Sequence, residues 1–348
     1  SMDNFDVAIV GGGAAGLAAL RELGASSLKV VLLEARPELG GRVRRVDGHD
    51  AGAAWVHGTH NNVLVREATG VELRAVSATN PWCDPFAVAK TARVLRDGRL
   101  LTDAEVDVDA RTFATRASRV ADDARAAKGW DTPLGLRGLD GRHARLLELW
   151  MGANVANLQL REFESFFDGR FGDHPGPHAL PGAGGMTRVL RNLVDTAAPR
   201  SLLSSPVREI RRTDAGGVQV AYGGDDRGRG GGGGGVLSAR ACIVALPLGV
   251  LKRDAGSSVG VVAAPSSLFV PPLPASKRGP IDRLGVGSYT KVFCSYRSAW
   301  WRRPLPSPRR PFLYLETGTE FLALVDRGAV FDDDDDDGEV VLEATVAG

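Results

Sequence analysis

The stretch DVAIVGGGAAG at residues 6–16 decides the fold. Its first half is a short apolar run, which predicts a strand, and its second half carries glycines at the G-x-G-x-x-G spacing of dinucleotide-binding turns. The next segment, LAALREL at 17–23, consists of helix formers, and a second apolar run at 28–33 ends in Glu34. Strand, glycine turn, helix and strand in this order predict a βαβ unit with parallel strands and a right-handed crossover.

The residues of this turn have the properties that binding of a diphosphate requires. Gly11 would allow the tight turn, Gly13 would let the diphosphate approach the backbone, and Gly16 would allow close packing of the helix. The backbone amides at the helix start, near Ala14 and Ala15, would donate hydrogen bonds to the phosphates with help from the helix dipole.

Glu34 stands where this fold places the acid that accepts hydrogen bonds from a ribose diol. Its carboxylate selects the unphosphorylated ribose of FAD or NAD. The alternative interpretation is a glycine-rich turn followed by a surface acid that binds no ligand.

The composition excludes several classes of protein. The 348 residues include 43 basic and 42 acidic side chains, and a net charge of +1 gives no basic field for nucleic acid. The three cysteines are too widely spaced for a disulfide framework or a zinc site, so we expect no metal site and a reducing compartment. No apolar run reaches the roughly 18 to 20 residues of a membrane span, so we expect a soluble protein.

Further along, helical and strand patterns alternate. Helical patterns occupy 61–69, 104–127, 143–158 and a segment that opens at 184; strand patterns occupy 207–211, 218–222, 243–246, 291–296, 312–315, 321–325 and 340–346. The apolar run IVAL at 243–246 predicts a central buried strand. The glycines at 230–235 and the aspartates at 332–337 predict solvated loops. Together these patterns predict an α/β chain in which a nucleotide-binding domain is interrupted by a second domain.

Five ordered segments resemble those of the flavin-containing amine oxidases, a family that includes polyamine oxidases, monoamine oxidases and lysine-specific histone demethylases. EARPELGGRV at 34–43 resembles the family's E-A-R-x-R-x-G-G-R, and DAGAAWVHG at 50–58 resembles its flavin-contacting G-A-x-W-x-H-G. The other three are PVREI at 206–210, VALPLGVLK at 244–252 and LGVGSYTKV at 284–292.

The resemblance implies a Rossmann-like FAD-binding domain with an inserted mixed α+β substrate domain. We expect residues 1–76 and 184–256 in the first domain, and residues 77–183 (helical) and 257–348 (strand-rich) in the second. It also implies that a final FAD-binding segment is missing, because the chain stops after the strand that normally precedes it.

FAD is the cofactor that the resemblance implies. Arg42 would neutralise the diphosphate, the backbone of Val207 would meet the adenine, and Trp55 would lie against the isoalloxazine. The full set of predicted cofactor-binding residues is Gly11, Gly13, Ala14, Ala15, Gly16, Glu34, Ala35, Arg36, Gly41, Arg42, Ala53, Ala54, Trp55 and Val207. Without a cofactor, Arg42 would be a surface arginine and Trp55 an ordinary core residue.

Two residues are the predicted catalytic groups. Lys291 resembles the family's lysine whose ammonium holds a water at flavin N5; a lysine at a strand start otherwise extends into solvent. His57 matches the histidine of the polyamine branch, which histone demethylases usually lack, and a neutral imidazole could hydrogen-bond an amine. The alternative for His57 is a buried histidine with a structural role.

The implied reaction is oxidation of spermine, spermidine or their acetylated forms by hydride transfer to flavin N5. It would give an aldehyde, a shorter amine and hydrogen peroxide, with dioxygen as the second substrate. The alternatives are a remnant or binding module without activity, and an oxidase resembling the lysine-specific histone demethylases.

One departure from the family's pattern bears on cofactor affinity, because Glu38 stands where an arginine is usual. We expect a cytoplasmic or peroxisomal protein with a small-molecule substrate. The sequence predicts neither a nucleic acid nor a membrane as partner and leaves the oligomeric state open.

Overall fold

The computed structural model describes residues 4–77, 92–127, 132–135, 138–139, 141–161, 178–197, 200–223, 234–254, 267–302, 312–318, 320–327 and 340–347. The chain forms two compact units: unit 1 comprises Ser1–Arg45 and Leu190–Val286, and unit 2 comprises Val46–Val189 and Gly287–Gly348. The domain boundaries expected near residues 76, 183 and 256 stay a prediction. Most of the glycine run, the whole aspartate run and Cys83 lie outside the described residues.

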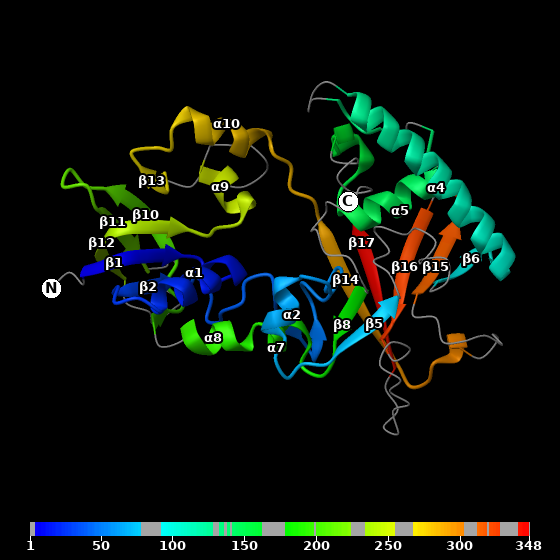
Figure 1. The fold of residues 1–348 in the computed structure, drawn as a ribbon, viewed down its shortest axis with the longest axis horizontal. Coiled ribbons are helices and arrows are strands. Elements are labelled where there is room, and N and C mark those ends of the chain that lie inside the picture. The colour runs from blue at the N-terminus through cyan, green and yellow to red at the C-terminus, as the bar shows by residue number, and fades with distance from the viewer. Residues whose placement is uncertain are drawn as a thin grey trace. The chain divides into compact units, whose positions relative to one another are not determined.

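Unit 1 contains a seven-stranded sheet in the order β13-β10-β11-β12-β1-β2-β9 (Figure 1). Its strands are β1 (Asn4–Val10), β2 (Val30–Leu33), β9 (Ser201–Leu202), β10 (Val207–Arg212), β11 (Val218–Tyr222), β12 (Gly235–Val244) and β13 (Phe269–Val270). β1 pairs in parallel with both β2 and β12, so segments far apart in the sequence lie side by side. The predicted βαβ unit is confirmed, because α1 (Ala14–Gly24) connects β1 to β2.

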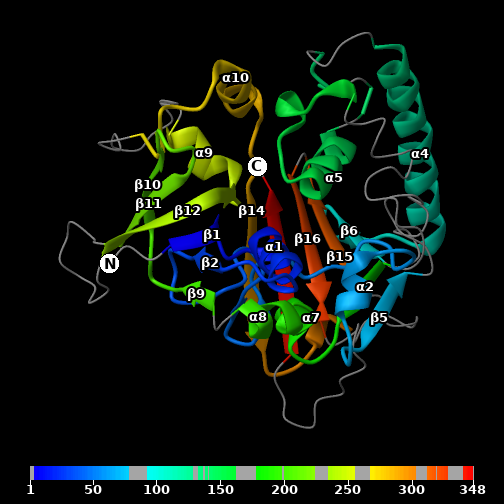
Figure 2. The same cartoon turned by 60° about the vertical axis from the view of Figure 1, so that its left-hand side comes forward.

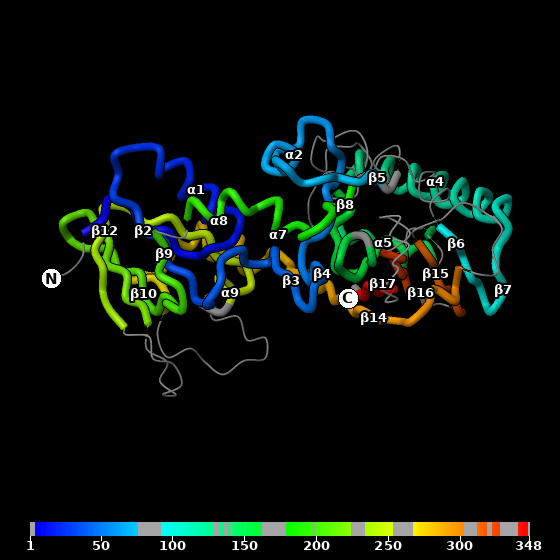
Figure 3. Tube along the Cα trace, turned by 90° about the horizontal axis from the view of Figure 1, so that it is seen from below, coloured from blue at the N-terminus to red at the C-terminus, as the bar shows by residue number. Residues whose placement is uncertain are grey.

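Both faces of β1 are covered. Successive side chains of a strand point to opposite faces, and Ala8, Ile9 and Val10 are all buried. α1 buries Leu17 and Leu20 and lies beside α8 (Arg191–Ala197) (Figure 3). The other helices described in unit 1 are α9 (Leu248–Asp254) and α10 (Ala275–Arg283).

The end of β12 differs from the expectation of a buried strand. The strand has the predicted central position between β11 and β1. Ile243 and Val244 are nevertheless 36% and 38% exposed. A strand is buried only where other layers cover both faces of its sheet, and the described residues cover this end of β12 incompletely.

Unit 2 is built on a six-stranded sheet in the order β14-β17-β16-β15-β6-β7. The strands are β6 (Ala92–Arg96), β7 (Arg99–Leu100), β14 (Tyr289–Tyr296), β15 (Phe312–Thr317), β16 (Glu320–Asp326) and β17 (Val340–Ala347). All four strands predicted after residue 290 are confirmed. Two smaller sheets pair β3 (Arg45–Val46) with β4 (His49–Asp50) and β5 (Leu73–Ser77) with β8 (His178–Pro181).

Two helices pack on one face of the six-stranded sheet (Figure 2). They are α4 (Asp103–Ala126) and α5 (Gly141–Met151), and α5 contacts β16 and β17. α4 begins as predicted, with a capping box in which Thr102 and Glu105 bond each other's backbone amides. Among the described helices, none is long and apolar enough to cross a bilayer.

Three predicted helices end earlier than expected or divide. The pattern at 143–158 gives α5 and then a short 3-10 turn (Val155–Asn157), because Gly152 adopts a φ of +68° and ends the helix. The segment opening at 184 gives α7 (Gly185–Val189) and α8, separated at Leu190. The pattern at 61–69 gives only the short α2 (Val63–Glu67).

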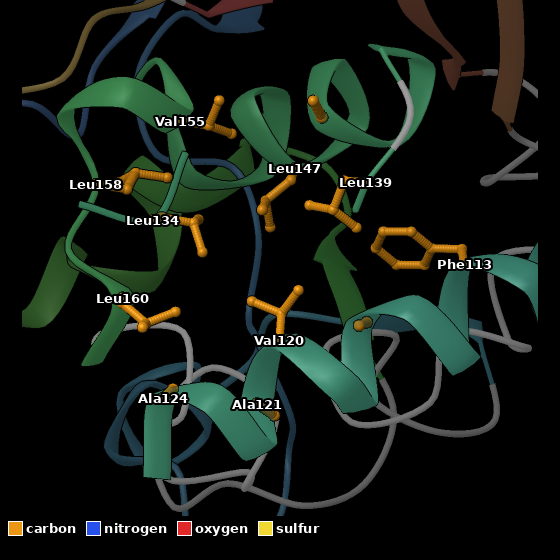
Figure 4. Close-up of a cluster of buried hydrophobic side chains, with 12 residues drawn as sticks. Phe113, Val120, Ala121, Ala124, Leu134, Leu139, Leu147, Val155, Leu158 and Leu160 are labelled. Carbon is orange, nitrogen blue, oxygen red and sulfur yellow. The ribbon is translucent and has the colours of Figure 1, made fainter. Parts of the chain in front are cut away.

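A buried cluster joins α4, α5 and the turn that follows α5 (Figure 4). Leu147 of α5 and Val120 of α4 are fully buried in it. This cluster fixes α5, and α5 in turn packs on β16 and β17.

We expect Leu147→Ala to lower the free energy of unfolding by about 2–5 kcal/mol, because it leaves a cavity in a closed cluster. Denaturant unfolding measures the change. The control is Val108→Ala on α4, a side chain 62% exposed, which should change the free energy by less than about 0.5 kcal/mol. Equal losses in the two variants would contradict the assignment of this core.

Candidate active site

The glycine turn of unit 1 has no room for side chains at its two outer motif positions. Gly11 has a φ of +109°, and a Cβ there would come within 2.6 Å of the carbonyl oxygen of Ala245. At Gly16 a Cβ would overlap the carbonyl oxygen of Gly11. Only glycine therefore lets α1 start against the end of β1.

The middle of the motif is arranged differently. A Cβ on Gly13 would have only the Cα of Gly41 near it, at 3.8 Å. This space leaves the backbone open to a ligand. Gly12, which is not one of the three glycines of the G-x-G-x-x-G spacing, is crowded as well, since a Cβ there would lie 2.7 Å from Leu39 and 3.0 Å from Glu34 Oε2.

Glu34 is held by two backbone amides. Gly12 N donates to Oε2 at 2.7 Å, and Arg36 N donates to Oε1 at 2.9 Å. The residue is only 7% exposed. An ionised carboxylate has about four acceptor sites, so two are occupied by the chain and others are left for the hydroxyls of a ribose.

The first turn of α1 is available to an anion. Ala14 and Ala15 are exposed, and no side chain of the described residues caps the helix start. Unsatisfied amides and the positive end of the helix dipole favour a phosphate at such a terminus.

A second glycine loop closes over this turn. Gly40 N donates to the carbonyl oxygen of Gly12 at 2.8 Å, and Arg36 Nη2 donates to the carbonyl oxygen of Gly41 at 2.8 Å. Arg36 therefore fixes the loop, and its contact with the cofactor stays a prediction. Ala35 and Arg42 are exposed beside this loop.

These contacts bring together the predicted residues between Gly11 and Arg42. Val207 lies at the start of β10 in the same unit and is half-buried. Open backbone at Gly13, a fixed acid at Glu34 and uncapped amides on α1 fit the adenosine diphosphate half of FAD.

The predicted catalytic lysine of unit 2, Lys291, lies on β14 and is buried. Its side chain is 6% exposed, and its Nζ lies 2.9 Å from Glu343 Oε1 on β17. The same Nζ donates to the carbonyl oxygen of Asp50 at 3.0 Å. Lys291 therefore does not extend into solvent, and it contacts the end of β4, from which the segment 50–58 continues.

The carboxylate of Asp50 has a separate partner. It accepts hydrogen bonds from Met186 N at 3.1 and 3.2 Å, in the first turn of α7. This bond fixes the backbone of Asp50, whose carbonyl oxygen accepts from Lys291.

Two aromatic pairs belong to the same unit. Phe293, two residues from Lys291 on the same face of β14, stacks on His49 at 4.8 Å between ring centroids. Trp55 stacks on Phe312 at 5.8 Å. This contact is ordinary packing, and the place of Trp55 against the isoalloxazine stays a prediction.

The segment leading to His57 is anchored by Val56, whose backbone exchanges two hydrogen bonds with Ala179. Ala54 and Val56 are buried, while Ala53 and His57 are exposed. Protein atoms around the His57 imidazole lower its pKa to about 4 by desolvation, although the residue is exposed. Solvent contact weakens desolvation, and what matters for function is the direction: the imidazole is neutral at pH 7.

Glu343 and Arg327 are site residues that the sequence analysis missed. Arg327 lies 3.5 Å from the second carboxylate oxygen of Glu343. The signal available in the sequence was the single acid in the otherwise apolar strand VVLEATV at 340–346. Among the described residues, no group of His, Cys, Asp and Glu has the geometry of a metal site.

Comparison with known proteins gives a consistent set of matches. Residues 14–348 match the family model for flavin containing amine oxidoreductases. Polyamine oxidase 5 of Oryza sativa subsp. japonica is 27% identical over 325 residues, 85% of this chain and 59% of that protein. Lysine-specific histone demethylase 1 homolog 3 of the same subspecies is 30% identical over 328 residues, 86% of this chain and 36% of that protein. This chain therefore spans about six-tenths of the polyamine oxidase it matches.

Solved structures show the same fold. A putrescine oxidase variant (A394C) aligns with a TM-score of 0.61 at 20% identity, covering 100% of this chain and 76% of that one. Cyclohexylamine oxidase from Brevibacterium oxydans aligns with a TM-score of 0.63 at 19% identity, covering 99% and 75%. The predicted fold class, a Rossmann-like domain with an inserted mixed α+β domain, is confirmed.

We expect Gly16→Ala to weaken FAD binding at least about tenfold, because the added Cβ forces α1 away from Gly11 and misplaces the amides of its first turn. Titration of the apoprotein with FAD, followed by flavin fluorescence, gives the dissociation constant. Gly249→Ala on α9 is the matched control, since a Cβ there meets nothing within 4 Å. A folded Gly16→Ala protein with the wild-type constant would contradict the site.

Proposed function

We propose that this chain, which belongs to the flavin-containing amine oxidoreductases, is an FAD-dependent oxidase of polyamines. The net reaction consumes one dioxygen and one water for each amine and yields an aldehyde, a shorter amine and hydrogen peroxide. The observation that carries the proposal is the buried ammonium of Lys291, held between Glu343 and the carbonyl oxygen of Asp50. The match to plant polyamine oxidases and the fold shared with putrescine oxidase support it.

Unit 1 would hold the adenosine diphosphate half of the cofactor. Glu34 would accept hydrogen bonds from the ribose, the amides of Ala14 and Ala15 would donate to the diphosphate, and Arg42 would balance its charge. When bound, FAD supplies the two-electron acceptor for the amine and returns the electrons to dioxygen.

Lys291 would hold a water by its remaining N–H. An ammonium has three donors, and within the described part of the chain Glu343 and Asp50 accept from two of them. The third can donate to a water at a fixed position, which is the role the family resemblance assigns to this lysine.

His57 would accept a hydrogen bond from the substrate amine. A neutral imidazole has one acceptor nitrogen, and desolvation keeps the pKa of this ring below neutral pH. Oxidation of the carbon beside the nitrogen needs the uncharged amine, because an ammonium has no lone pair to support the developing positive charge. The aromatic side chains of Trp55, Phe312 and Phe293 favour that uncharged form by excluding water.

A second candidate within the family is an oxidase of methylated lysine, since a demethylase homolog is 30% identical to this chain. His57 favours polyamines, because the histone demethylases usually lack a histidine at this position of the motif. A panel of spermine, N-acetylspermine, a monoamine and a dimethyl-lysine peptide separates the two. Peroxide release with the peptide and with none of the polyamines would overturn the substrate class.

We expect Lys291→Met to retain FAD and to slow its anaerobic reduction by spermine at least about tenfold, because the methionine cannot hold the water. Stopped-flow absorbance of the flavin band measures the rate constant. Lys277→Met is the control, an exposed lysine on α10. An unchanged reduction rate in Lys291→Met would remove this residue from the mechanism.

The pH dependence of reduction should belong to the substrate and not to His57. Because desolvation lowers the pKa of His57 from its usual value, we expect the ring to stay neutral between pH 7 and 9, and the rate to rise over this range as the substrate ammonium loses its proton. His57→Gln should lower the rate about tenfold and leave the inflection at the same pH. An inflection that vanishes in the variant would show that His57 itself titrates there.

A further inference from the structure

Glu343 forms ion pairs with two basic residues of unit 2, Lys291 and Arg327. It belongs to β17, which runs between β14 and β16 (Figure 1). Glu343 pairs with Phe293 on β14 and with Val325 on β16. Lys291 and Arg327 each lie two residues from those partners, so both reach Glu343 diagonally on the same face of the sheet. The carboxylate is 1% exposed.

Each of the two basic side chains contacts a different oxygen of the Glu343 carboxylate. Lys291 Nζ is 2.9 Å from Oε1, and Arg327 Nη1 is 3.5 Å from Oε2. The shorter contact belongs to the more deeply buried cation, since the side chain of Lys291 is 6% exposed and that of Arg327 is 16% exposed. Glu343 is therefore bound primarily to Lys291.

Stability alone does not account for this arrangement. Burying a Lys–Glu pair costs so much desolvation that apolar residues of similar volume often stabilise a protein equally well or better. Structural ion pairs elsewhere in unit 2 use arginine: Arg302 makes two hydrogen bonds to Asp326, and Arg96 bonds Glu316. A lysine, with its compact charge and rotatable donors, suits a group that must point one donor at a ligand.

We propose that Glu343 is a positioning residue, which holds the Lys291 ammonium so that its third N–H points at the water used in amine oxidation. The part of this inference that concerns the water rests on the proposed function. The part that concerns the contact between Glu343 and Lys291 rests on the geometry alone. Asp50 supplies the second contact, and its own carboxylate is fixed by Met186 N. Two fixed acceptors determine the direction left to the third donor.

The first test uses the protein without cofactor. Acetic anhydride acetylates lysines that are uncharged and accessible, and mass spectrometry of the Lys291 peptide reports the extent. Glu343→Gln removes the charge; Glu343→Asp keeps the charge and shortens the side chain by one methylene. We expect acetylation of Lys291 at pH 8 to rise about tenfold in both, relative to Lys277 in the same sample.

The second test uses the FAD-loaded protein in anaerobic stopped-flow. A misplacement of about 1 Å can cost roughly a hundredfold in rate. We expect the limiting reduction rate to fall roughly ten- to hundredfold in both variants while the half-saturating spermine concentration stays unchanged. Loss of a merely structural pair would not separate the two constants in this way.

Glu316→Gln is the matched control. It removes a buried carboxylate of the same sheet, one that pairs with Arg96 and contacts neither Lys291 nor Glu343 among its described interactions. This control should leave both the acetylation of Lys291 and the reduction rate as in the wild type.

Three outcomes would overturn the inference. Unchanged acetylation in folded Glu343→Gln and Glu343→Asp would show that Glu343 does not hold Lys291. Increased acetylation with an unchanged reduction rate would show a structural pair only. Equal effects in Glu316→Gln would show that any lost ion pair loosens the sheet. If no amine reduces the wild-type protein, the proposed function fails, and the acetylation experiment still decides whether Glu343 holds the ammonium.

Discussion

The close approach of Gly16 to the carbonyl oxygen of Gly11 is the constraint on which the cofactor half of the structure depends. Because no side chain fits between them, α1 starts directly at the end of β1. The first helical turn then follows directly on the glycine turn, whose Gly12 N, together with Arg36 N, fixes the carboxylate of Glu34. The terminus proposed to bind phosphate and the acid proposed to bind ribose thus depend on one backbone contact.

Unit 2 depends on a different kind of constraint, a buried charge that must be balanced. An ammonium inside a sheet is costly unless it is paired and hydrogen-bonded, and Lys291 is both. The ammonium of Lys291 on β14 is balanced by Glu343 on β17 and by the carbonyl oxygen of Asp50 at the end of β4. These polar contacts agree with the proposed role of Lys291, in which the direction of one donor matters more than the stability gained.

Much of this architecture could be predicted from the sequence, because its signals are local. The run at 6–16 predicted β1, the turn and α1, and the apolar runs after residue 290 predicted four strands of unit 2.

The predictions that failed did so because of tertiary context. Ile243 and Val244 end a central strand but are only partly covered, and Gly152 ended a helix whose composition continued. The Glu343–Lys291 pair joins strands about fifty residues apart, which no local pattern reveals. The same limit applies to Gly12, whose crowding by Leu39 and Glu34 depends on how the two glycine loops meet.

The most direct test of the account is a crystal structure of the protein with FAD bound. We expect the diphosphate within about 3 Å of the amides of Ala14 and Ala15, and the ribose hydroxyls on the carboxylate of Glu34. FAD bound elsewhere, or a glycine turn closed by the protein's own side chains, would contradict the central claim that this turn is the cofactor site of an amine oxidase.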